Sequence, residues 1–209
     1  MIRILLVDDH AVVREGYRRL LERRADLRIE AEAASAEEAL QRLREITPDL
    51  TILDVSLPKM GGIELISRIL QRQPDARILV FSMHRNPLFA AQAIRAGALG
   101  YVTKSSSPDV LIQAVYKVAS NEKVLSPDIA PEMALTLLQG ESNPAEELNP
   151  REFEILRFLL GGLGVEAIGT ILNISPKTVQ NVHYQIKAKL GVKTDLELAR
   201  LAMKLKLIE

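Results

Sequence analysis

Short apolar runs alternate with helix-like stretches along the first 120 residues of the chain. The runs have the length of buried strands and cover residues 3–7, 27–33, 50–55, 76–82 and 99–103. The stretches between them open with signals such as Ser35 and Pro108, and the predicted helices are residues 11–24, 36–46, 62–72, 87–96 and 108–120. This alternation predicts an α/β domain with a doubly wound, five-stranded parallel sheet.

The pattern changes after residue 120. Residues 121–146 are rich in proline, serine, asparagine and glutamate around one apolar patch, IAPEMALTLL, which could form a short helix after Pro131. The flanks of this patch have too little apolar surface to pack. We therefore interpret the stretch as a linker between two domains.

Residues 147–209 form a second predicted domain of four helices. The helices are expected to begin near Pro150, residue 165, Pro176 and Asp195. Asn149 and Glu152 have the spacing of a capping box at the first helix, and Gly191 ends the third. The second and third helices, joined by a tight turn, predict a helix-turn-helix whose second helix enters the DNA major groove.

The third of these helices has an apolar stripe and a polar face. The stripe, expected to be buried, comprises Ile174, Val179, Val182, Ile186 and Leu190. The exposed remainder comprises Lys177, Thr178, Gln180, Asn181, His183, Tyr184, Lys187 and Lys189. Gln and Asn side chains suit adenine edges, and Lys and Thr suit phosphates or base edges, although a solvated helix face has the same composition.

Composition limits the available chemistry. The chain has 209 residues, a formal net charge of zero and no cysteine, which excludes disulfides, thiolate metal sites and cysteine nucleophiles. Residues 150–209 carry nine Lys or Arg against six Asp or Glu, which is a weak indication of nucleic-acid binding. No apolar run approaches the roughly 18 residues of a membrane span, and the N-terminus lacks a signal-peptide pattern. A cytoplasmic protein without membrane contact is therefore expected.

Polar side chains follow the predicted strands at one edge of the sheet. Asp8 and Asp9 end the first strand and Asp54 ends the third. Ser82 ends the fourth strand, and Lys104 follows the fifth. In doubly wound sheets this edge holds the ligand site, and carboxylates crowded there repel one another unless they share a cation such as Mg²⁺. With a lysine and a hydroxyl as donors, the set suits an incoming phosphoryl group that one carboxylate accepts.

Four sequence blocks in this region resemble the signature motifs of bacterial response-regulator receiver domains. They are VDDH, ILDVSLPKMGG, FSMH and GYVTKSSSP, in the usual order and spacing over residues 1–120. The resemblance implies a flavodoxin-like fold in which Asp54 is the phosphoacceptor. It also implies that Mg²⁺, or Mn²⁺, is held by Asp8, Asp9, Asp54 and the backbone carbonyl of Ser56. The residues implied to bind the phosphoryl group, or to switch with it, are Ser82, Lys104 and Tyr101.

Three further side chains lie beside these motifs. Met83 follows Ser82 at a position where many receivers carry a small residue, and its bulk could shield an acyl phosphate from water. We interpret His10 as a first-helix position and His84 as a loop residue that tunes access to the site.

The C-terminal blocks LNPRE, EAIGTILNISPKTV and KLGVKTDLELARLA resemble the four-helix LuxR-type DNA-binding domain over residues 147–209. Receiver and output together resemble the NarL/FixJ family of response regulators, and the RNPLF and SPDIAPEMAL segments are most similar to its GacA/UvrY branch. The DNA-facing residues that this implies are Lys177, Thr178, Gln180, Asn181, Tyr184 and Lys187. Before the turn, Val165, Glu166 and Ala167 replace a common Asn-Lys-Glu and remove a positive charge, so DNA binding by one domain is expected to be weak.

The resemblance also implies partners. They are a sensor histidine kinase as phosphoryl donor, double-stranded promoter DNA as target, and a second copy of the chain in a phosphorylated homodimer. A dimer could use an apolar stripe on the last helix, which comprises Leu198, Leu201, Ala202 and Leu205; the same stripe could equally pack against its own domain. No enzyme activity is expected beyond self-phosphorylation and slow dephosphorylation.

Two other functions fit parts of the pattern. An aspartyl-phosphate hydrolase also uses a carboxylate nucleophile, but it normally carries a second acid two residues later, where this chain has Ser56. Alternatively, the receiver could act as a protein-interaction module while the output domain binds DNA independently of phosphorylation.

Overall fold

The structure of the chain, a computed structural model, describes residues 1–139, 144–205 and 207. The chain divides into two compact units, Met1–Leu135 and Thr136–Glu209, and each is described by itself. The first unit extends past residue 120, where the sequence pattern placed the end of the domain, and includes much of the predicted linker. Residues 140–143 of that linker lie outside the described residues.

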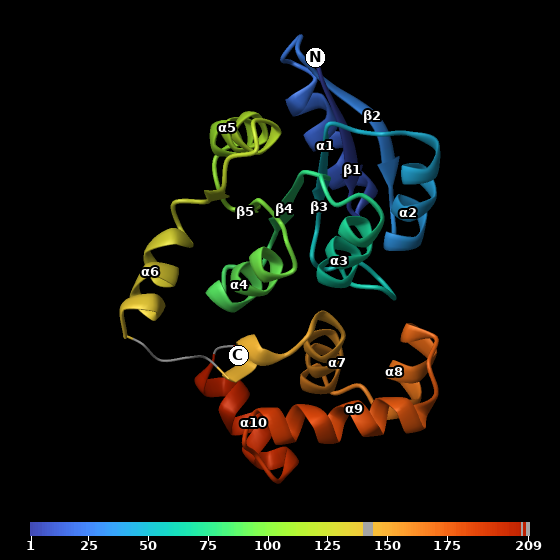
Figure 1. Cartoon of the computed structure of the whole chain (residues 1–209), viewed down its shortest axis with the longest axis vertical. Helices are drawn as coiled ribbons and strands as arrows, with labels where there is room; N and C mark the ends of the chain where they lie inside the picture. Colours follow the sequence, from blue (N-terminus) through green and yellow to red (C-terminus); the bar gives the residue numbers. More distant parts are fainter. Residues whose placement is uncertain (140–143, 206, 208–209) are drawn as a thin grey trace. The chain divides into compact units, whose positions relative to one another are not determined.

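The first unit contains a six-stranded sheet in which all neighbouring strands are parallel (Figure 1). In spatial order its strands are β2 (Leu27–Ala33), β1 (Ile2–Val7), β3 (Leu50–Leu53), β4 (Ile78–Ser82), β5 (Gly100–Thr103) and β6 (Val124–Leu125). The five predicted strands are all present, although β3 ends at Leu53 instead of residue 55. The doubly wound α/β class is confirmed.

The sequence pattern did not predict β6, so the prediction of five strands is corrected to six. The Val124 N–H donates to the Leu99 carbonyl at 3.0 Å, and the Ser126 N–H donates to the Tyr101 carbonyl at 2.9 Å. A strand of two half-buried residues is too short to show a hydrophobic period, which is why its sequence looked like linker. The segment after α5 is therefore attached to β5 by backbone hydrogen bonds.

Helices cover both faces of the sheet (Figure 1). On one face lie α1 (Ala11–Leu21) and α5 (Pro108–Ala119). On the other lie α2 (Ala36–Glu45), α3 (Gly62–Arg72) and α4 (Pro87–Arg95). The predicted cap of α2 is confirmed, because the Ser35 side chain accepts a hydrogen bond from the Glu38 N–H at 3.1 Å.

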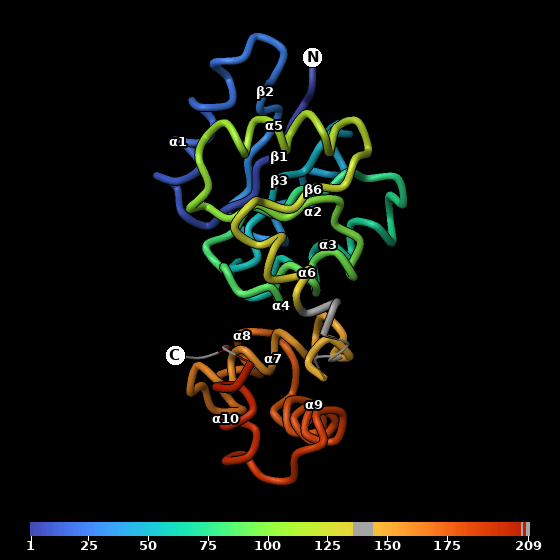
Figure 2. The backbone as a smooth tube through the Cα atoms, turned by 90° about the vertical axis from the view of Figure 1, so that its left-hand side faces the viewer, coloured from blue at the N-terminus to red at the C-terminus, as the bar shows by residue number. Residues whose placement is uncertain are grey.

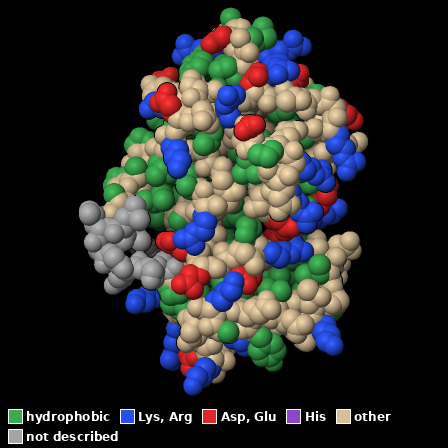
Figure 3. All heavy atoms as spheres, in the orientation of Figure 1, with side chains coloured by type: hydrophobic (Ala, Val, Ile, Leu, Met, Phe, Trp, Pro, Cys, Tyr) green, Lys and Arg blue, Asp and Glu red, His purple; other side chains and the backbone are tan. Residues whose placement is uncertain are grey.

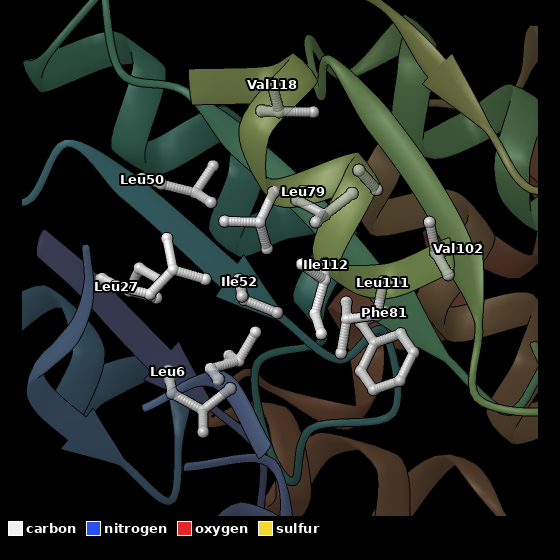
Figure 4. Close-up of a cluster of buried hydrophobic side chains, with 14 of the residues drawn as sticks. Leu6, Leu27, Leu50, Ile52, Leu79, Phe81, Val102, Leu111, Ile112 and Val118 are labelled. Carbon is white, nitrogen blue, oxygen red and sulfur yellow. The ribbon is translucent and has the colours of Figure 1, made fainter. Parts of the chain in front are cut away.

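Alternate side chains of the strands form a core with α5. Figure 4 shows Leu6, Leu50, Ile52, Leu79, Phe81 and Val102 from the strands together with Leu111, Ile112 and Val118 from α5. The residues between them, such as Leu5 and Val80, point to the opposite face and are also buried. Burial on both faces explains why the strands read as continuous apolar runs.

The sheet reverses its winding direction between β1 and β3. From β1 the chain first moves outward to β2 and then returns to β3 on the other side of β1. At such a switch point the loops at the carboxyl ends of the two strands turn to opposite faces and leave a crevice. Asp8 follows β1 and Asp54 follows β3, so both lie at the mouth of this crevice.

The second unit follows the predicted four-helix pattern, and Figure 2 traces its path. The elements in this part of the chain are α6 (Ala130–Gln139), which spans the division between the units, a 3-10 turn (Pro144–Glu147), α7 (Pro150–Leu160), α8 (Val165–Leu172), α9 (Pro176–Lys189) and α10 (Asp195–Lys204). The capping box of Asn149 with Glu152 is confirmed, and at α9 the Ser175 side chain caps the helix by accepting a hydrogen bond from the Thr178 N–H. The short helix predicted near Pro131 is α6.

The turn between α8 and α9 is tight enough to require glycine inside α8. A Cβ atom built on Gly169 would lie 2.8 Å from the Ile174 carbonyl oxygen, closer than real Cβ contacts. The Ile174 N–H donates to the Gly169 carbonyl at 2.9 Å, and Asn173 between them adopts a left-handed φ of 53°. This glycine lets the two helices of the helix-turn-helix approach each other.

The surface carries both signs of charge. On the face shown in Figure 3, Lys and Arg side chains are interspersed with Asp and Glu, in keeping with the zero net charge of the chain. Among the described residues, none of the helices has the length and apolar content needed to cross a membrane.

Candidate functional site

Asp8 and Asp54 lie at the crevice between the carboxyl ends of β1 and β3. Each is only 3% exposed. The Asp8 N–H donates to Ala33 and the Asp54 N–H donates to Val7, so the backbone of both residues continues the sheet pairing beyond the strand ends. This pairing fixes the direction in which the two carboxylates leave the backbone.

Lys104 joins the two carboxylates. Its Nζ atom donates to Asp8 Oδ2 at 2.5 Å and to Asp54 Oδ2 at 2.6 Å. Burial alone would lower the pKa of Lys104, but the hydrogen bonds and charges of Asp54 and Asp8 outweigh it and raise the pKa above its usual value. The lysine is therefore charged and neutralises part of the buried negative charge.

Asp9 and His10 lie at the rim of the same crevice. His10 Nδ1 is 2.8 Å from Asp9 Oδ1 and 3.5 Å from Asp8 Oδ1. Ligand atoms of Asp8, Asp9 and His10 all lie within 4.8 Å of one another, a spacing that one metal ion could bridge. The carboxylate oxygens are the hard ligands that Mg²⁺ prefers, so the residues present fit this ion. The structure places His10 at the N-cap of α1, which agrees with the first-helix position expected from the sequence.

Ser82 lies at the buried end of β4, beside the loop that carries Lys104. It is fully buried, and its carbonyl accepts a hydrogen bond from the Lys104 N–H at 2.8 Å. The His84 N–H lies 3.4 Å from its Oγ atom and donates to it. The structure therefore brings together the residues that the sequence singled out at the strand ends, with Ser82 joined to Lys104 through the backbone: Asp8, Asp9, Asp54, Ser82 and Lys104.

The loop after Asp54 packs tightly against its backbone. The Ser56 N–H donates to Asp54 Oδ1 at 3.1 Å, which orients the carboxylate. A Cβ atom at Gly62, the first residue of α3, would lie 2.1 Å from the Asp54 carbonyl oxygen and 2.8 Å from Val55 Cα. No side chain fits there without a shift of the backbone, so Gly62 is needed for α3 to begin beside Asp54.

His84 connects three parts of the site, which the sequence did not reveal. Its Nε2 atom lies 2.9 Å from Ser56 Oγ, its ring stacks on Phe89 at 4.0 Å, and its carbonyl accepts the Tyr101 hydroxyl at 2.8 Å. Tyr101 is fully buried and points inward. Met83, in contrast, is 68% exposed. The only sequence signal for these contacts of His84 is its position two residues after Ser82, directly after the FSM segment.

The second unit presents the predicted recognition helix, α9. Five of the predicted DNA-facing residues are exposed: Lys177, Thr178, Gln180, Asn181 and Tyr184. The sixth, Lys187, is largely buried and donates to Asp195 Oδ1 at 2.9 Å. His183 was predicted to be exposed but is only 17% exposed, because it turns toward Asp195, where its Nε2 atom lies 3.1 Å from Oδ1. The stripe predicted to be buried is fully buried at Val179, Ile186 and Leu190 and half-buried at Ile174 and Val182.

The predicted dimer stripe on α10 is corrected for two of its residues. Leu198 and Ala202 are 4% and 2% exposed, so they pack within the chain and leave almost no area for a second copy. Leu201 and Leu205 are half-buried. The exposed apolar side chains of α10 are instead Leu196 and Met203.

Two family profiles match the chain. "Response regulator receiver domain" matches residues 4–116, and "Bacterial regulatory proteins, luxR family" matches residues 146–202. The response regulator GacA of Pseudomonas viridiflava is 36% identical over 206 residues, which cover 98% of this chain and 96% of the relative. The response regulator UvrY of Escherichia coli K12 is 35% identical over 206 residues, which cover 98% and 94%. The chain belongs to the NarL/FixJ family of response regulators, in which a receiver is joined to a LuxR-type DNA-binding domain.

Solved structures agree with this assignment. A two-component response regulator of the LuxR family from Aurantimonas sp. SI85-9A1 is 51% identical, with a TM-score of 0.65 over 66% of this chain and 99% of that one. RcsB from Salmonella enterica serovar Typhimurium, bound to promoter P1flhDC in the presence of phosphomimetic BeF3⁻, is 26% identical with a TM-score of 0.74 over 97% and 98%.

Proposed function

We propose that this protein is a transcription regulator that accepts a phosphoryl group on Asp54 and then binds promoter DNA through α9. The observation that carries the proposal is the buried triad in which the Lys104 ammonium bridges Asp8 and Asp54. A charged lysine beside a buried carboxylate is suited to bind the oxygens of a phosphoryl group that the carboxylate receives.

The acceptor chemistry follows from this geometry. An oxygen of Asp54 forms a bond to phosphorus while the bond between phosphorus and the donor breaks, so the donor leaves and an acyl phosphate remains. Lys104 Nζ and Ser82 Oγ then donate hydrogen bonds to the phosphoryl oxygens. Asp8, Asp9, Asp54 and the carbonyl of Ser56 would hold Mg²⁺, or Mn²⁺, which when bound neutralises negative charge on the phosphoryl group.

The partners follow from the family and from the exposed face of α9. A sensor histidine kinase is the proposed donor, and double-stranded promoter DNA is the proposed target; RcsB of the same fold is bound to promoter DNA in its solved structure. Gln180 and Asn181 are exposed and can contact base edges, and Lys177 can contact phosphates. We propose that two copies bind paired half-sites, that the protein acts in the cytoplasm where this DNA lies, and that it has no turnover activity toward a free substrate.

Phosphoryl transfer from radiolabelled acetyl phosphate tests the acceptor. Wild-type protein should incorporate label in the presence of Mg²⁺, and Asp54→Asn should not, because an amide is not a phosphoryl acceptor. Asp109→Asn is the matched control, since Asp109 is an exposed aspartate in the first turn of α5. Equal labelling of Asp54→Asn and wild type would overturn the assignment of Asp54.

In vitro selection of DNA by the full chain tests the output. A two-fold symmetric sequence should be enriched with acetyl phosphate and Mg²⁺, and enriched much less without them. Equal enrichment in both conditions would favour the alternative in which the receiver is a protein-interaction module. Sustained release of phosphate from a phosphate monoester would contradict the absence of turnover.

A further inference from the structure

A cluster of hydrogen bonds centred on the partly buried carboxylate of Asp128 lies behind the loop that carries Lys104. Asp128 lies between β6 and α6, in the stretch that the sequence pattern assigned to the linker. Its Oδ2 atom accepts the Thr103 hydroxyl at 2.5 Å and the Ser105 hydroxyl at 3.4 Å. Its Oδ1 atom accepts the Ser106 hydroxyl at 3.5 Å. Three hydroxyls from one loop therefore converge on one carboxylate from another segment.

The base of this cluster is buried. Thr103 and Ser126 are both fully buried, and the Thr103 N–H donates to Ser126 Oγ at 3.4 Å. Ile129, the residue after Asp128, is also fully buried. Burial raises the pKa of Asp128, but the hydroxyls of Ser126 and Thr103 outweigh it and hold the pKa below its usual value. The carboxylate is thus ionised and firmly placed.

The cluster holds the chain on both sides of Lys104. Thr103 and Ser105, both of which bind Asp128, are the residues on either side of Lys104. The Lys104 ammonium itself binds Asp8 and Asp54. The anchoring of its two neighbours limits how far the lysine backbone can move.

The loop after β4 contacts the same carboxylate. Arg85 Nε lies 3.8 Å from Asp128 Oδ2, and Arg85 follows Ser82 by three residues. The Ser82 carbonyl in turn accepts the Lys104 N–H. Both loops that supply hydrogen-bond donors to the phosphoryl site therefore contact Asp128.

We propose that Asp128 is a positioning residue for the phosphoryl site, because it fixes the loop that carries Lys104. Through the same contacts, the segment leading into α6 becomes less mobile when a phosphoryl group is bound to Asp54. The inference rests on the proposed phosphoryl acceptance at Asp54 and adds a further residue to it. A lysine already held near its bound position loses less conformational freedom when it binds the phosphoryl oxygens. By linkage, the phosphoryl group must stabilise the docked position of Asp128 as much as Asp128 favours its binding.

The test compares full-length Asp128→Ala and Thr103→Val with wild type. Binding of beryllofluoride, a phosphoryl analogue, is measured by calorimetry at saturating Mg²⁺, and Mg²⁺ binding is measured separately. Both variants should bind beryllofluoride about fivefold more weakly or worse, because Asp128→Ala removes all three hydroxyl contacts behind Lys104 and Thr103→Val removes the shortest of them. Mg²⁺ affinity should change much less, because Asp128 reaches the metal-binding carboxylates Asp8 and Asp54 only through Lys104. Asp128→Asn keeps one acceptor oxygen and should recover most of the affinity.

The control is Asp109→Ala, which removes an exposed carboxylate from the first turn of α5 and should bind beryllofluoride like wild type. Hydrogen exchange supplies the second measurement: beryllofluoride should slow exchange of residues 124–130 in wild type and not in Asp128→Ala. Wild-type beryllofluoride affinity in both variants would overturn the inference, and so would equal loss of beryllofluoride and Mg²⁺ affinity, which indicates general loosening. If wild type bound no beryllofluoride and took no label from acetyl phosphate, the proposed function itself would fall, and the inference with it.

Discussion

Lys104 Nζ donates a hydrogen bond to Asp54 Oδ2 at 2.6 Å, although the two residues are 50 positions apart in the chain. The same nitrogen binds Asp8, and all three side chains are about 5% exposed or less. The lysine is thus the internal counter-ion of the Asp54 carboxylate, which we propose as the phosphoryl acceptor.

Lys104→Met keeps the side-chain length and removes the charge. We expect the free energy of unfolding in EDTA to fall by about 3 kcal/mol, because the loss of one member of a buried ion pair leaves the others uncompensated. Saturating Mg²⁺ should restore part of this loss, since the cation replaces the missing positive charge. Urea denaturation with EDTA and with MgCl₂ measures both effects, and Lys117→Met, on the exposed face of α5, is the control. A Mg²⁺ response no larger than that of wild type would contradict the expectation.

Gly62→Ala should disturb the acceptor. The new Cβ atom would meet the Asp54 carbonyl oxygen at 2.1 Å, so the start of α3 or the backbone of Asp54 must shift. We expect a loss of about 2 kcal/mol in unfolding free energy, typical of overpacking, together with slower labelling by acetyl phosphate. Gly16→Ala is the matched control: its Cβ atom meets nothing within 4 Å inside α1, and it should stabilise the protein by about 0.5 to 1 kcal/mol. Normal labelling of Gly62→Ala would show that the close contact is not required.

His183 should make the stability of the chain depend on pH. Burial lowers its pKa from the ordinary 6.5, with Lys187 acting in the same direction and Asp195 against it. Because the folded-state pKa is the lower one, the unfolded chain binds the proton more tightly, and the contribution of His183 is fully present above pH 6.5 and is lost as pH falls through the folded-state value. Denaturation of wild type and His183→Gln between pH 7.5 and pH 5 checks this: the variant should lose less stability on acidification. Identical pH dependence in the two proteins would refute it.

Asp195→Asn should strengthen DNA binding, because Asp195 competes with DNA phosphates for the Lys187 ammonium. It holds the Lys187 ammonium at 2.9 Å on the edge of the recognition helix. In Asp195→Asn the lysine becomes available to a phosphate, so affinity for duplex DNA should rise and the slope of log affinity against log salt should steepen by about one. Fluorescence anisotropy over a salt series measures the slope. In the double variant with Lys187→Met the gain should disappear; if it persisted, the effect would come from Asp195 alone.

Much of the first unit could be predicted from the sequence because its signals are local. A buried parallel strand reads as an apolar run, and the residue that follows it must lie at the carboxyl edge of the sheet. That rule alone placed Asp8, Asp54, Ser82 and Lys104 at one edge. The helix caps of the second unit were predictable for the same reason, since a cap such as Asn149 with Glu152 is contained within four consecutive residues.

The errors concern residues whose role depends on distant neighbours. Residues 124–125 are too few to show a period, and they form a strand only because β5 offers a free edge. The apolar stripe of α10 could have packed against a second copy of the chain or against its own domain. In the structure Leu198 and Ala202 are buried within their own chain. His183 lies on the helix face that the sequence assigned to solvent, but Asp195 of the next helix draws it inward.

The sequence by itself determined the fold class, the set of residues at the strand ends and the family, because each rests on patterns within short segments and on their order. Only the tertiary structure decided which atoms meet. Lys104 bridges Asp8 and Asp54, and Asp128 accepts hydrogen bonds from the loop that carries Lys104. These contacts join residues 22 to 96 positions apart. They exist because the packing of the sheet and its helices brings strand ends and loops together at one edge of the sheet. No pattern within a short segment of sequence predicts that these residues are close in space.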